Sequence, residues 1–296
     1  MIPNRFLERG AEDCGLIWMA ARPAGPAPTA DRFSAWLRAG RQGGLGWMLR
    51  SEAARADPRL YRPGAETVVL VGVSYATEDP PNEYWNDLQR GRIARFAWGP
   101  DYHNVLDARL KEFSDFLGRS HPGVRTLARF TDSRPILERA WAAASGEGFI
   151  GKNTQFILPA RGSFVLLGGL LLDTKAESSP RTEERAGDPC GDCAECLRAC
   201  PGEALIAPRE LDVAHCLSYW TIEHKTAIPA AVAARMSRWV FGCDECQQVC
   251  PFILGRNRNS GTSFLKFEPD RDAPLLTELF DLDPDGFLER YAGTSV

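Results

Sequence analysis

Eight of the nine cysteines in this 296-residue chain lie in one stretch, from Cys190 to Cys250. Its first run has the form C-x₂-C-x₂-C-x₃-C-P, its second has the form C-x₂-C-x₃-C-P, and one cysteine stands between them. The first form is the cysteine spacing of bacterial 4Fe–4S sites. Two structural zinc sites could also use eight cysteines, but zinc requires neither the third closely spaced cysteine nor the C-P ending. The spacing therefore favours two 4Fe–4S clusters.

The order of the cysteines predicts which thiolates share a cluster. In proteins with two such clusters, the last cysteine of each run ligates the other cluster. The second run lacks an opening cysteine, and Cys216 can supply that thiolate. One cluster is therefore expected on Cys190, Cys193, Cys196 and Cys250, and the other on Cys200, Cys216, Cys243 and Cys246. The odd count disfavours disulfides, and the remaining Cys14 is expected to be a small, buried hydrophobic residue.

Composition and charge limit the classes of partner. The chain has 44% hydrophobic residues, a net charge of −4 and a pI of about 5.7. It therefore has no overall basic surface for nucleic acid, and such a partner would need a local patch. The candidate cations for a patch are Lys225, Arg235, Arg238, Arg256 and Arg258. No apolar segment is long enough for a signal peptide or a membrane helix, so we expect a cytoplasmic protein that does not engage a membrane.

The elements that must position these residues can be read from hydrophobic periodicity. Short β-branched or apolar runs predict strands over 67–75, 124–130 and 162–173. Helical patterns cover 4–21, 31–39, 105–117 and 136–144, and shorter ones lie around 275–280 and 287–291. Helices thus alternate with strands up to residue 173, which favours an α/β layered domain. We expect three parts: 1–178, 179–260 with the cysteines, and a tail at 261–296.

Asp132 stands where the strand at 124–130 gives way to a helix. Layered α/β folds often place ligand-facing residues at such junctions. An aspartate in this position is more often an ordinary turn or cap residue, and the residue pattern alone favours that interpretation.

Five motifs together are more specific than the cysteine spacing. They are AWGPDYH at 97–103, DSRPILER at 132–139, GFIGKN at 148–153, CLSYWTIEHK at 216–225 and FGCDECQQVCP at 241–251. In identity and order, over nearly the whole chain, they resemble the epoxyqueuosine reductases. The sequence departs from the family at Arg134, where small residues are common, and at Ser145-Gly146-Glu147. Many members continue beyond the equivalent of residue 296, so we expect either weaker tRNA binding or a shortened chain.

The resemblance implies a fold and an activity. The fold would be α/β (α+β), with a nitroreductase-like cobalamin-binding domain, a bacterial ferredoxin-like domain with two 4Fe–4S clusters, and a short helical tail. The reaction would be reduction of the epoxide of epoxyqueuosine, in the wobble position of tRNA, to an alkene. The implied cofactors are cobalamin and the two clusters. The implied partners are tRNA and a reducing electron-donor protein, and the chain is expected to be a monomer.

The resemblance also assigns roles to single residues. Asp132 would protonate the expelled epoxide oxygen, and because an ionised aspartate cannot donate, its pKa is expected to be raised. Cobalamin contacts carry over to Arg55, Ala94, Asp132, Phe156, Gly168, Ser218 and Asp244. Lys225 would lie near the tRNA. Without the resemblance, Phe156 and Gly168 would be taken as core residues, and Lys225 as a solvated charge.

Two alternative functions remain open from the sequence. A reductive dehalogenase-like enzyme in the cytoplasm would use the same two cofactors on a small organohalide. A ferredoxin-like electron carrier would have no substrate, but about 180 residues of α/β sequence ahead of the cysteines argue against it.

Overall fold

The computed structural model describes residues 1–179, 187–253 and 264–296. Its centre is a four-stranded sheet in the order β1-β2-β7-β4, in which every neighbouring pair is antiparallel. The strands are β1 (Trp18–Pro23), β2 (Thr67–Ser74), β7 (Val165–Leu172) and β4 (Thr126–Phe130). Every residue of β2 is buried, as expected for a continuous β-branched run in the middle of a covered sheet. The three predicted strands are thus confirmed.

The first predicted helix is wrong in its second half. Helix α1 (Asn4–Asp13) ends just before Gly15, which has a φ of 71° in the left-handed region. The apolar residues that follow form β1, which pairs with β2 at the edge of the sheet. The side chains of β1 are buried when the strand joins the sheet, and this burial outweighs the local helical pattern. Cys14 follows α1 directly and packs, half-buried, against the core.

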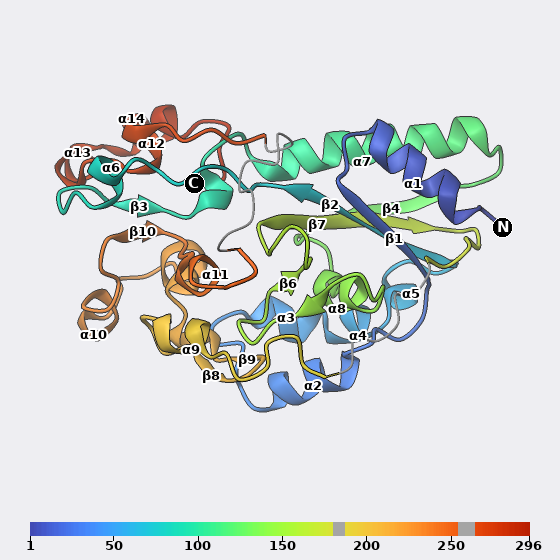
Figure 1. Ribbon diagram of the computed structural model, residues 1–296, viewed down its shortest axis with the longest axis horizontal. Helices are drawn as coiled ribbons and strands as arrows, with labels where there is room; N and C mark the ends of the chain where they lie inside the picture. The colour runs from blue at the N-terminus through green and yellow to red at the C-terminus, as the bar shows by residue number, and fades with distance from the viewer. Residues whose placement is uncertain (180–186, 254–263) are drawn as a thin grey trace.

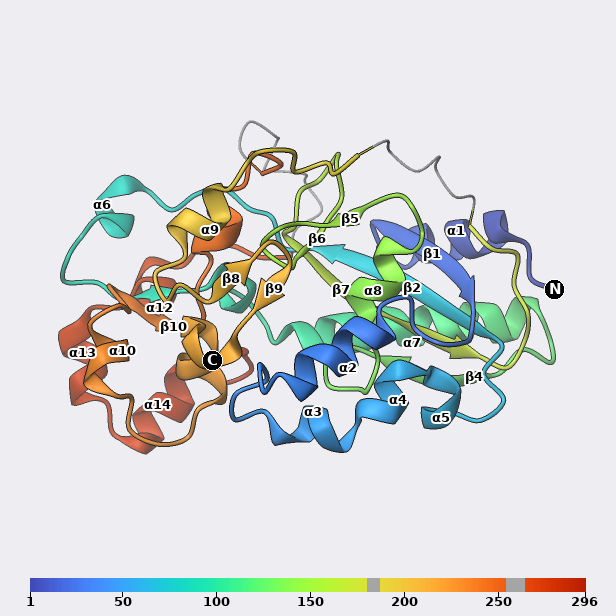
Figure 2. The ribbon, with the colours of Figure 1, turned by 90° about the horizontal axis from the view of Figure 1, so that it is seen from below.

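Helices α1 and α7 (Tyr102–Ser120) cover one face of the sheet (Figure 1). Their apolar residues Leu7, Leu110 and Phe113 pack with Val69 and Val71 of β2. Side chains alternate between the two faces of a strand, so Val68 and Leu70 point to the opposite layer. That layer holds α2 (Ala30–Arg38), α3 (Gly46–Arg50), α4 (Glu52–Ala56), α5 (Pro58–Tyr61), α8 (Glu138–Ala143) and the hairpin of β5 (Phe149–Ile150) and β6 (Phe156–Ile157) (Figure 2).

The cysteine-rich segment contains only short elements. They are α9 (Glu195–Ala199), β8 (Leu205–Ala207), β9 (Glu210–Leu211), η2 (Val213–His215), the π-helix η3 (Tyr219–Glu223), α10 (Ala230–Ala233), β10 (Trp239–Phe241) and α11 (Glu245–Gln248). Strand β10 pairs in parallel with β3 (Arg92–Ile93). The buried Trp239 also packs edge-to-face on Trp85, with ring centroids 5.8 Å apart. The segment is therefore joined to the N-terminal part by both backbone pairing and side-chain packing.

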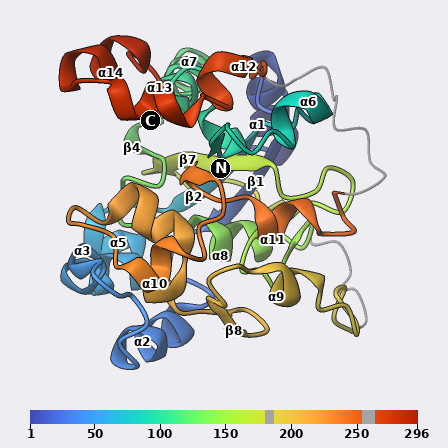
Figure 3. The ribbon, with the colours of Figure 1, turned by 90° about the vertical axis from the view of Figure 1, so that its left-hand side faces the viewer.

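The C-terminal residues form three short helices that lie together (Figure 3), and Phe267, just before them, packs edge-to-face on Tyr84 of α6 (Asn82–Trp85), which precedes the turn η1 (Arg95–Ala97) in the chain. These are α12 (Pro269–Asp272), α13 (Leu276–Asp281) and α14 (Pro284–Arg290). The mixed fold and the short helical tail agree with the prediction. The proposed boundary at 260/261 and the cations Arg256 and Arg258 lie outside the described residues. In the ranges that the structure describes, no helix has the length and apolar character needed to cross a membrane.

Candidate active site and cluster sites

The eight predicted ligand cysteines come together in two groups. The pKa of Cys196 is raised by burial and then by the nearby thiols of Cys250, Cys190 and Cys193. The pKa of Cys246 is raised by burial and then by the thiols of Cys243, Cys216 and Cys200. We call the set Cys190, Cys193, Cys196 and Cys250 the outer group, and the set Cys200, Cys216, Cys243 and Cys246 the inner group. Their role as ligands stays a prediction.

Burial is the largest cause of the raised pKa in both groups, at Cys196 and Cys250 as at Cys216, Cys243 and Cys246. The names refer to surroundings, because the loop between Cys190 and Cys193 is exposed whereas Asp244, between two inner-group cysteines, is buried. Across the described ranges, no three Cys, His, Asp or Glu side chains are close enough to hold one metal ion.

Three of the predicted cofactor contacts lie at the inner group. Ser218 hydrogen-bonds to the thiol of Cys216. Asp244, between two inner-group cysteines, is 2% exposed and accepts a 2.7 Å hydrogen bond from the backbone N–H of Arg95. Burial raises the pKa of Asp244 to about 6. Ala94 precedes that N–H, and a methyl group added at Gly242 would lie only 2.5 Å from its Cβ.

Asp132 meets the N-terminus of α7. The hydroxyl of Tyr102 donates to one of its carboxylate oxygens, and Nε2 of His103 lies 2.9 Å from the other. On the far side of the imidazole, Nδ1 lies 2.8 Å from Asp101 Oδ1, which also accepts the backbone N–H of His103. Asp101 is the N-cap of α7, so the capping carboxylate that begins the helix also orients the imidazole. The turn after strand β4 supplies the aspartate and helix α7 supplies its two partners.

These contacts fix where the proton lies. Partial desolvation by its neighbours raises the pKa of Asp132, but the hydrogen bonds from His103 and Tyr102 and the charge of His103 outweigh it, and the net pKa is lowered although the side chain stays 57% exposed. The hydrogen bond to Asp132 is the largest cause of the raised pKa of His103, which reaches about 9. The expectation of a raised Asp132 pKa is therefore wrong. At neutral pH the proton is on the imidazole and the aspartate is ionised.

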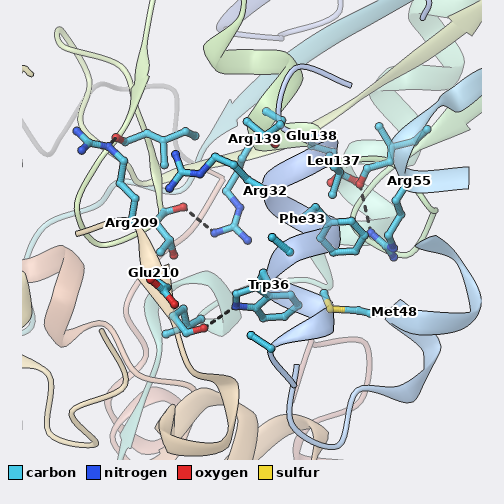
Figure 4. Close-up of a pocket in the computed structure, with 18 residues that line it drawn as sticks. Arg32, Phe33, Trp36, Met48, Arg55, Leu137, Glu138, Arg139, Arg209 and Glu210 are labelled. Carbon is cyan, nitrogen blue, oxygen red and sulfur yellow. Dashed lines mark hydrogen bonds between the residues drawn. The ribbon is translucent and has the colours of Figure 1, made fainter. Parts of the chain in front are cut away.

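A cavity of about 480 Å³ lies between α2, the start of α8 and the β8–β9 hairpin (Figure 4). Arg55 lines it, held by hydrogen bonds to Ser51 (2.9 Å) and to the carbonyl of Ile136 (3.3 Å). Glu138 lines it too, and its Oε1 is buried without a hydrogen-bond partner among the described residues. Burial is the largest cause of the raised pKa of Glu138, which reaches about 8. Sequence analysis assigned no role to Glu138, because no residue pattern shows that its Oε1 is buried in a cavity wall.

The remaining predicted contacts lie elsewhere. Phe156 is 4% exposed and packs on Trp18, with ring centroids 5.3 Å apart. Gly168 is buried in β7, where an added Cβ would lie 2.8 Å from the carbonyl of Phe130, two residues before Asp132. Lys225 is exposed and donates to the carbonyl of Ile222 at 3.0 Å. Of the predicted cobalamin contacts, Arg55 is the one that lines the cavity.

Models of known protein families match two stretches of the chain. A family model described as "4Fe-4S double cluster binding domain" matches residues 189–253, and one described as "Epoxyqueuosine reductase QueG, DUF1730" matches residues 55–133. An epoxyqueuosine reductase of Gloeobacter violaceus is 39% identical over 250 residues, which cover 82% of this chain and 73% of that protein. That of Xanthomonas campestris pv. campestris is 36% identical over 293 residues, covering 98% and 79%. The chain belongs to the epoxyqueuosine reductase family.

Solved epoxyqueuosine reductases share the fold. A crystal structure with an epoxyqueuosine-modified tRNA stem loop has a TM-score of 0.84 at 27% identity, covering 98% of this chain and 76% of that one. A structure from Bacillus subtilis, in which a catalytic aspartate loop is swung out of the active site, has a TM-score of 0.82 at 27% identity with the same coverage. The double-cluster match identifies the cysteine segment as a 4Fe–4S domain rather than a pair of zinc sites.

Proposed function

We propose that this chain reduces the epoxide of epoxyqueuosine in tRNA to an alkene, with cobalamin as its cofactor and two 4Fe–4S clusters as its electron supply. Family membership and a solved relative with an epoxyqueuosine-modified stem loop support the substrate. The observation that carries the proposal is the Tyr102–Asp132–His103 arrangement, a held proton at the end of a strand. A cytoplasmic monomer served by a separate reducing protein remains part of the proposal.

Cobalamin is compatible with the residues that the structure shows. Its periphery carries amide groups and a phosphate. Glu138, with a pKa of about 8, is a neutral acid at pH 7 and can donate a hydrogen bond to an amide oxygen from Oε1, which has no partner among the described residues. Arg55 and Arg139 line the same cavity and can bind a phosphate or further amide oxygens. Ala94, Ser218 and Asp244 would contact the cofactor near the inner cysteine group.

The chemistry sets what the protein must supply. Converting an epoxide to an alkene consumes two electrons and two protons and releases the oxygen as water. Bound cobalamin would supply a strongly reducing, nucleophilic cobalt. The two clusters, bound by the outer and inner groups, would pass electrons one at a time toward the cofactor.

The protein's own contribution is the proton. The imidazolium of His103 holds a proton against Asp132 at neutral pH, and Tyr102 orients the carboxylate from its other oxygen. The imidazolium of His103 would give its proton to Asp132, and Asp132 would pass that same proton to the departing oxygen, so the pair acts as a general acid with two members. The second proton would reach the same pair from solvent, because the side chain of Asp132 is 57% exposed.

Turnover on two substrates separates this proposal from a dehalogenase. Protein reconstituted anaerobically with iron, sulfide and cobalamin, and supplied with electrons by a low-potential chemical reductant, should convert an epoxyqueuosine-containing stem loop to its queuosine form and leave a chlorinated phenol intact. Omitting cobalamin should abolish conversion. Release of chloride without any conversion of the stem loop would overturn the proposed substrate.

A further inference from the structure

The GFIGKN motif forms a tight turn that touches both cysteine groups. Strands β5 and β6 pair through Phe149 and Ile157, and the turn is closed by a 2.9 Å hydrogen bond from the N–H of Gly151 to the carbonyl of Gln155. A Cβ at Gly151 would lie 2.6 Å from both Asn153 Oδ1 and Ile157 Cδ1. The turn thus has little freedom to move its two polar residues, Lys152 and Asn153.

Lys152 holds the outer group. Its Nζ donates to the carbonyl of Cys193 at 2.9 Å and to that of Gly191 at 2.5 Å, both in the loop of the first two cysteines. The backbone strengthens this attachment, because the N–H of Arg209 donates to the carbonyl of Lys152 and the Arg209 side chain pairs with Asp188, two residues before Cys190. A fixed positive charge therefore lies against the ligand loop.

Asn153 holds the inner group. It is 2% exposed, and its Nδ2 donates to the carbonyl of Cys246 at 2.9 Å. Its Oδ1 accepts the N–H of Gln155 at 3.2 Å, which fixes the orientation of the amide within the turn. Two consecutive residues of one turn are thus bonded to two different cysteine groups.

We propose that Lys152 and Asn153 are positioning residues that connect the loops of the two clusters. Lys152 would favour reduction of the outer cluster, and Asn153 would fix a ligand of the inner cluster. The ammonium of Lys152 stabilises the electron added to the outer cluster, because opposite charges attract more strongly near a protein surface than in bulk water. Asn153 carries no charge and instead fixes the backbone of an inner ligand. This inference rests on the two-cluster assignment and does not depend on the tRNA substrate.

A redox titration followed by EPR tests the lysine. In Lys152→Gln, the ratio of reduced to oxidised outer cluster at a fixed potential should fall on the order of tenfold. The transition of the inner cluster should stay at the potential that it has in the wild type. Lys152→Arg should restore most of the ratio because it retains the charge. Lys175→Gln is the matched control, since Lys175 is exposed and lies outside the cysteine segment. The proposal fails for Lys152 if neither transition moves, or if both move equally.

Chelator challenge tests the asparagine. Asn153→Ala leaves the carbonyl of Cys246 without its hydrogen-bond donor. The iron of the inner cluster, about half of the total, should therefore be released on the order of tenfold faster than in the wild type. The outer-cluster transition should not move. Asn153→Gln, which keeps the amide on a longer side chain, serves as the second variant. Unchanged iron release in both variants would overturn the role of Asn153, whether or not the protein turns over tRNA.

Discussion

At neutral pH the proton of the candidate site belongs to His103, because its ring lies between the carboxylates of Asp132 and Asp101. Motif resemblance pointed to Asp132 alone. No sequence pattern shows that a strand end and a helix start share one hydrogen-bond network, so the partners of Asp132 had to come from the structure. Tyr102 and His103 stood in the AWGPDYH motif without an assigned role.

The first prediction concerns the pH dependence of turnover. Activity that needs protonated His103 should be retained below its pKa of about 9 and fall as the pH rises through that value. Asp132→Asn removes the largest cause of the raised pKa, so the fall should move toward the ordinary histidine value of about 6.5 and the maximal rate should drop at least tenfold. The measurement is the pH profile of the turnover rate. A basic limb at the same pH in both proteins would show that His103 does not hold the proton.

The interaction of His103 with Asp132 also makes the stability of the fold depend on pH. The folded-state pKa of His103 is raised, so its contribution is complete below the unfolded value of about 6.5 and is lost as the pH rises through about 9. His103→Gln should therefore lose its stability difference from the wild type between these two pH values. Thermal melts across that range provide the measurement, and a difference that grows with pH would contradict the assignment.

Glu138 supports a second residue-scale prediction. Its pKa of about 8 is raised mainly by burial and then by Asp132, while Arg55 and Arg139 oppose the shift. Above pH 8 the carboxyl becomes an anion and can no longer donate a hydrogen bond, so cobalamin affinity should fall as the pH rises through 8. Glu138→Gln keeps a donor at every pH and should remove this dependence. Equilibrium titration with cobalamin measures it, and an identical pH dependence in both proteins would exclude Glu138 from the cofactor site.

At the scale of elements, the close contact of β7 with its neighbours requires glycine. A Cβ at Gly169 would lie 1.9 Å from the carbonyl oxygen of Val69 and 2.5 Å from the ring of Phe130. Gly169→Ala should therefore lower the free energy of unfolding by about 3 kcal/mol, with the sheet forced apart. Chemical denaturation followed by circular dichroism measures this change.

Gly118 is the matched control. It is exposed near the end of α7, and a methyl group there would meet no described atom within 4 Å beyond its own helical turns. Gly118→Ala should raise stability by about 0.5–1 kcal/mol, because alanine favours the helix. Equal destabilisation by both variants would show that the effect at Gly169 does not come from crowding in the sheet.

The elements also show how far sequence patterns reach. Strands β2, β4 and β7 were predictable because their β-branched or apolar runs have a local signal. Strand β1 was not predictable from the sequence, because its residues continue a helical pattern. They form a strand because they pair with the free edge of β2. The cysteine spacing predicted the 4Fe–4S domain, but the parallel pairing of β10 with β3 joins segments nearly 150 residues apart and has no local signal.

At the scale of the molecule, a net charge of −4 requires that tRNA be held by local cations. Arg238 donates to the carbonyls of Asp87 and Trp85, and Arg235 pairs with Glu203, so both side chains have structural partners. Lys225 is exposed and bonds only a carbonyl of its own turn among the described contacts. It is the better candidate for a phosphate contact.

Lys225→Glu should therefore raise the KM for the tRNA stem loop several-fold and change the kcat less, because phosphate contacts position the substrate without entering the chemistry. The salt dependence of binding should also weaken by about one unit of slope. Lys175→Glu makes the same change of charge and should leave both quantities unaltered. A KM equal to that of the wild type would remove Lys225 from the tRNA surface.

The proposed reaction requires electrons to pass from two clusters to cobalamin within this chain. The most direct measurement is an anaerobic titration of the reconstituted protein with cob(II)alamin, followed by iron analysis, absorption and EPR. We predict about eight irons per chain and a cob(II)alamin EPR signal that changes on binding and is lost when the clusters are reduced. An iron content near eight with a cob(II)alamin signal identical to that of the free cofactor would contradict the account.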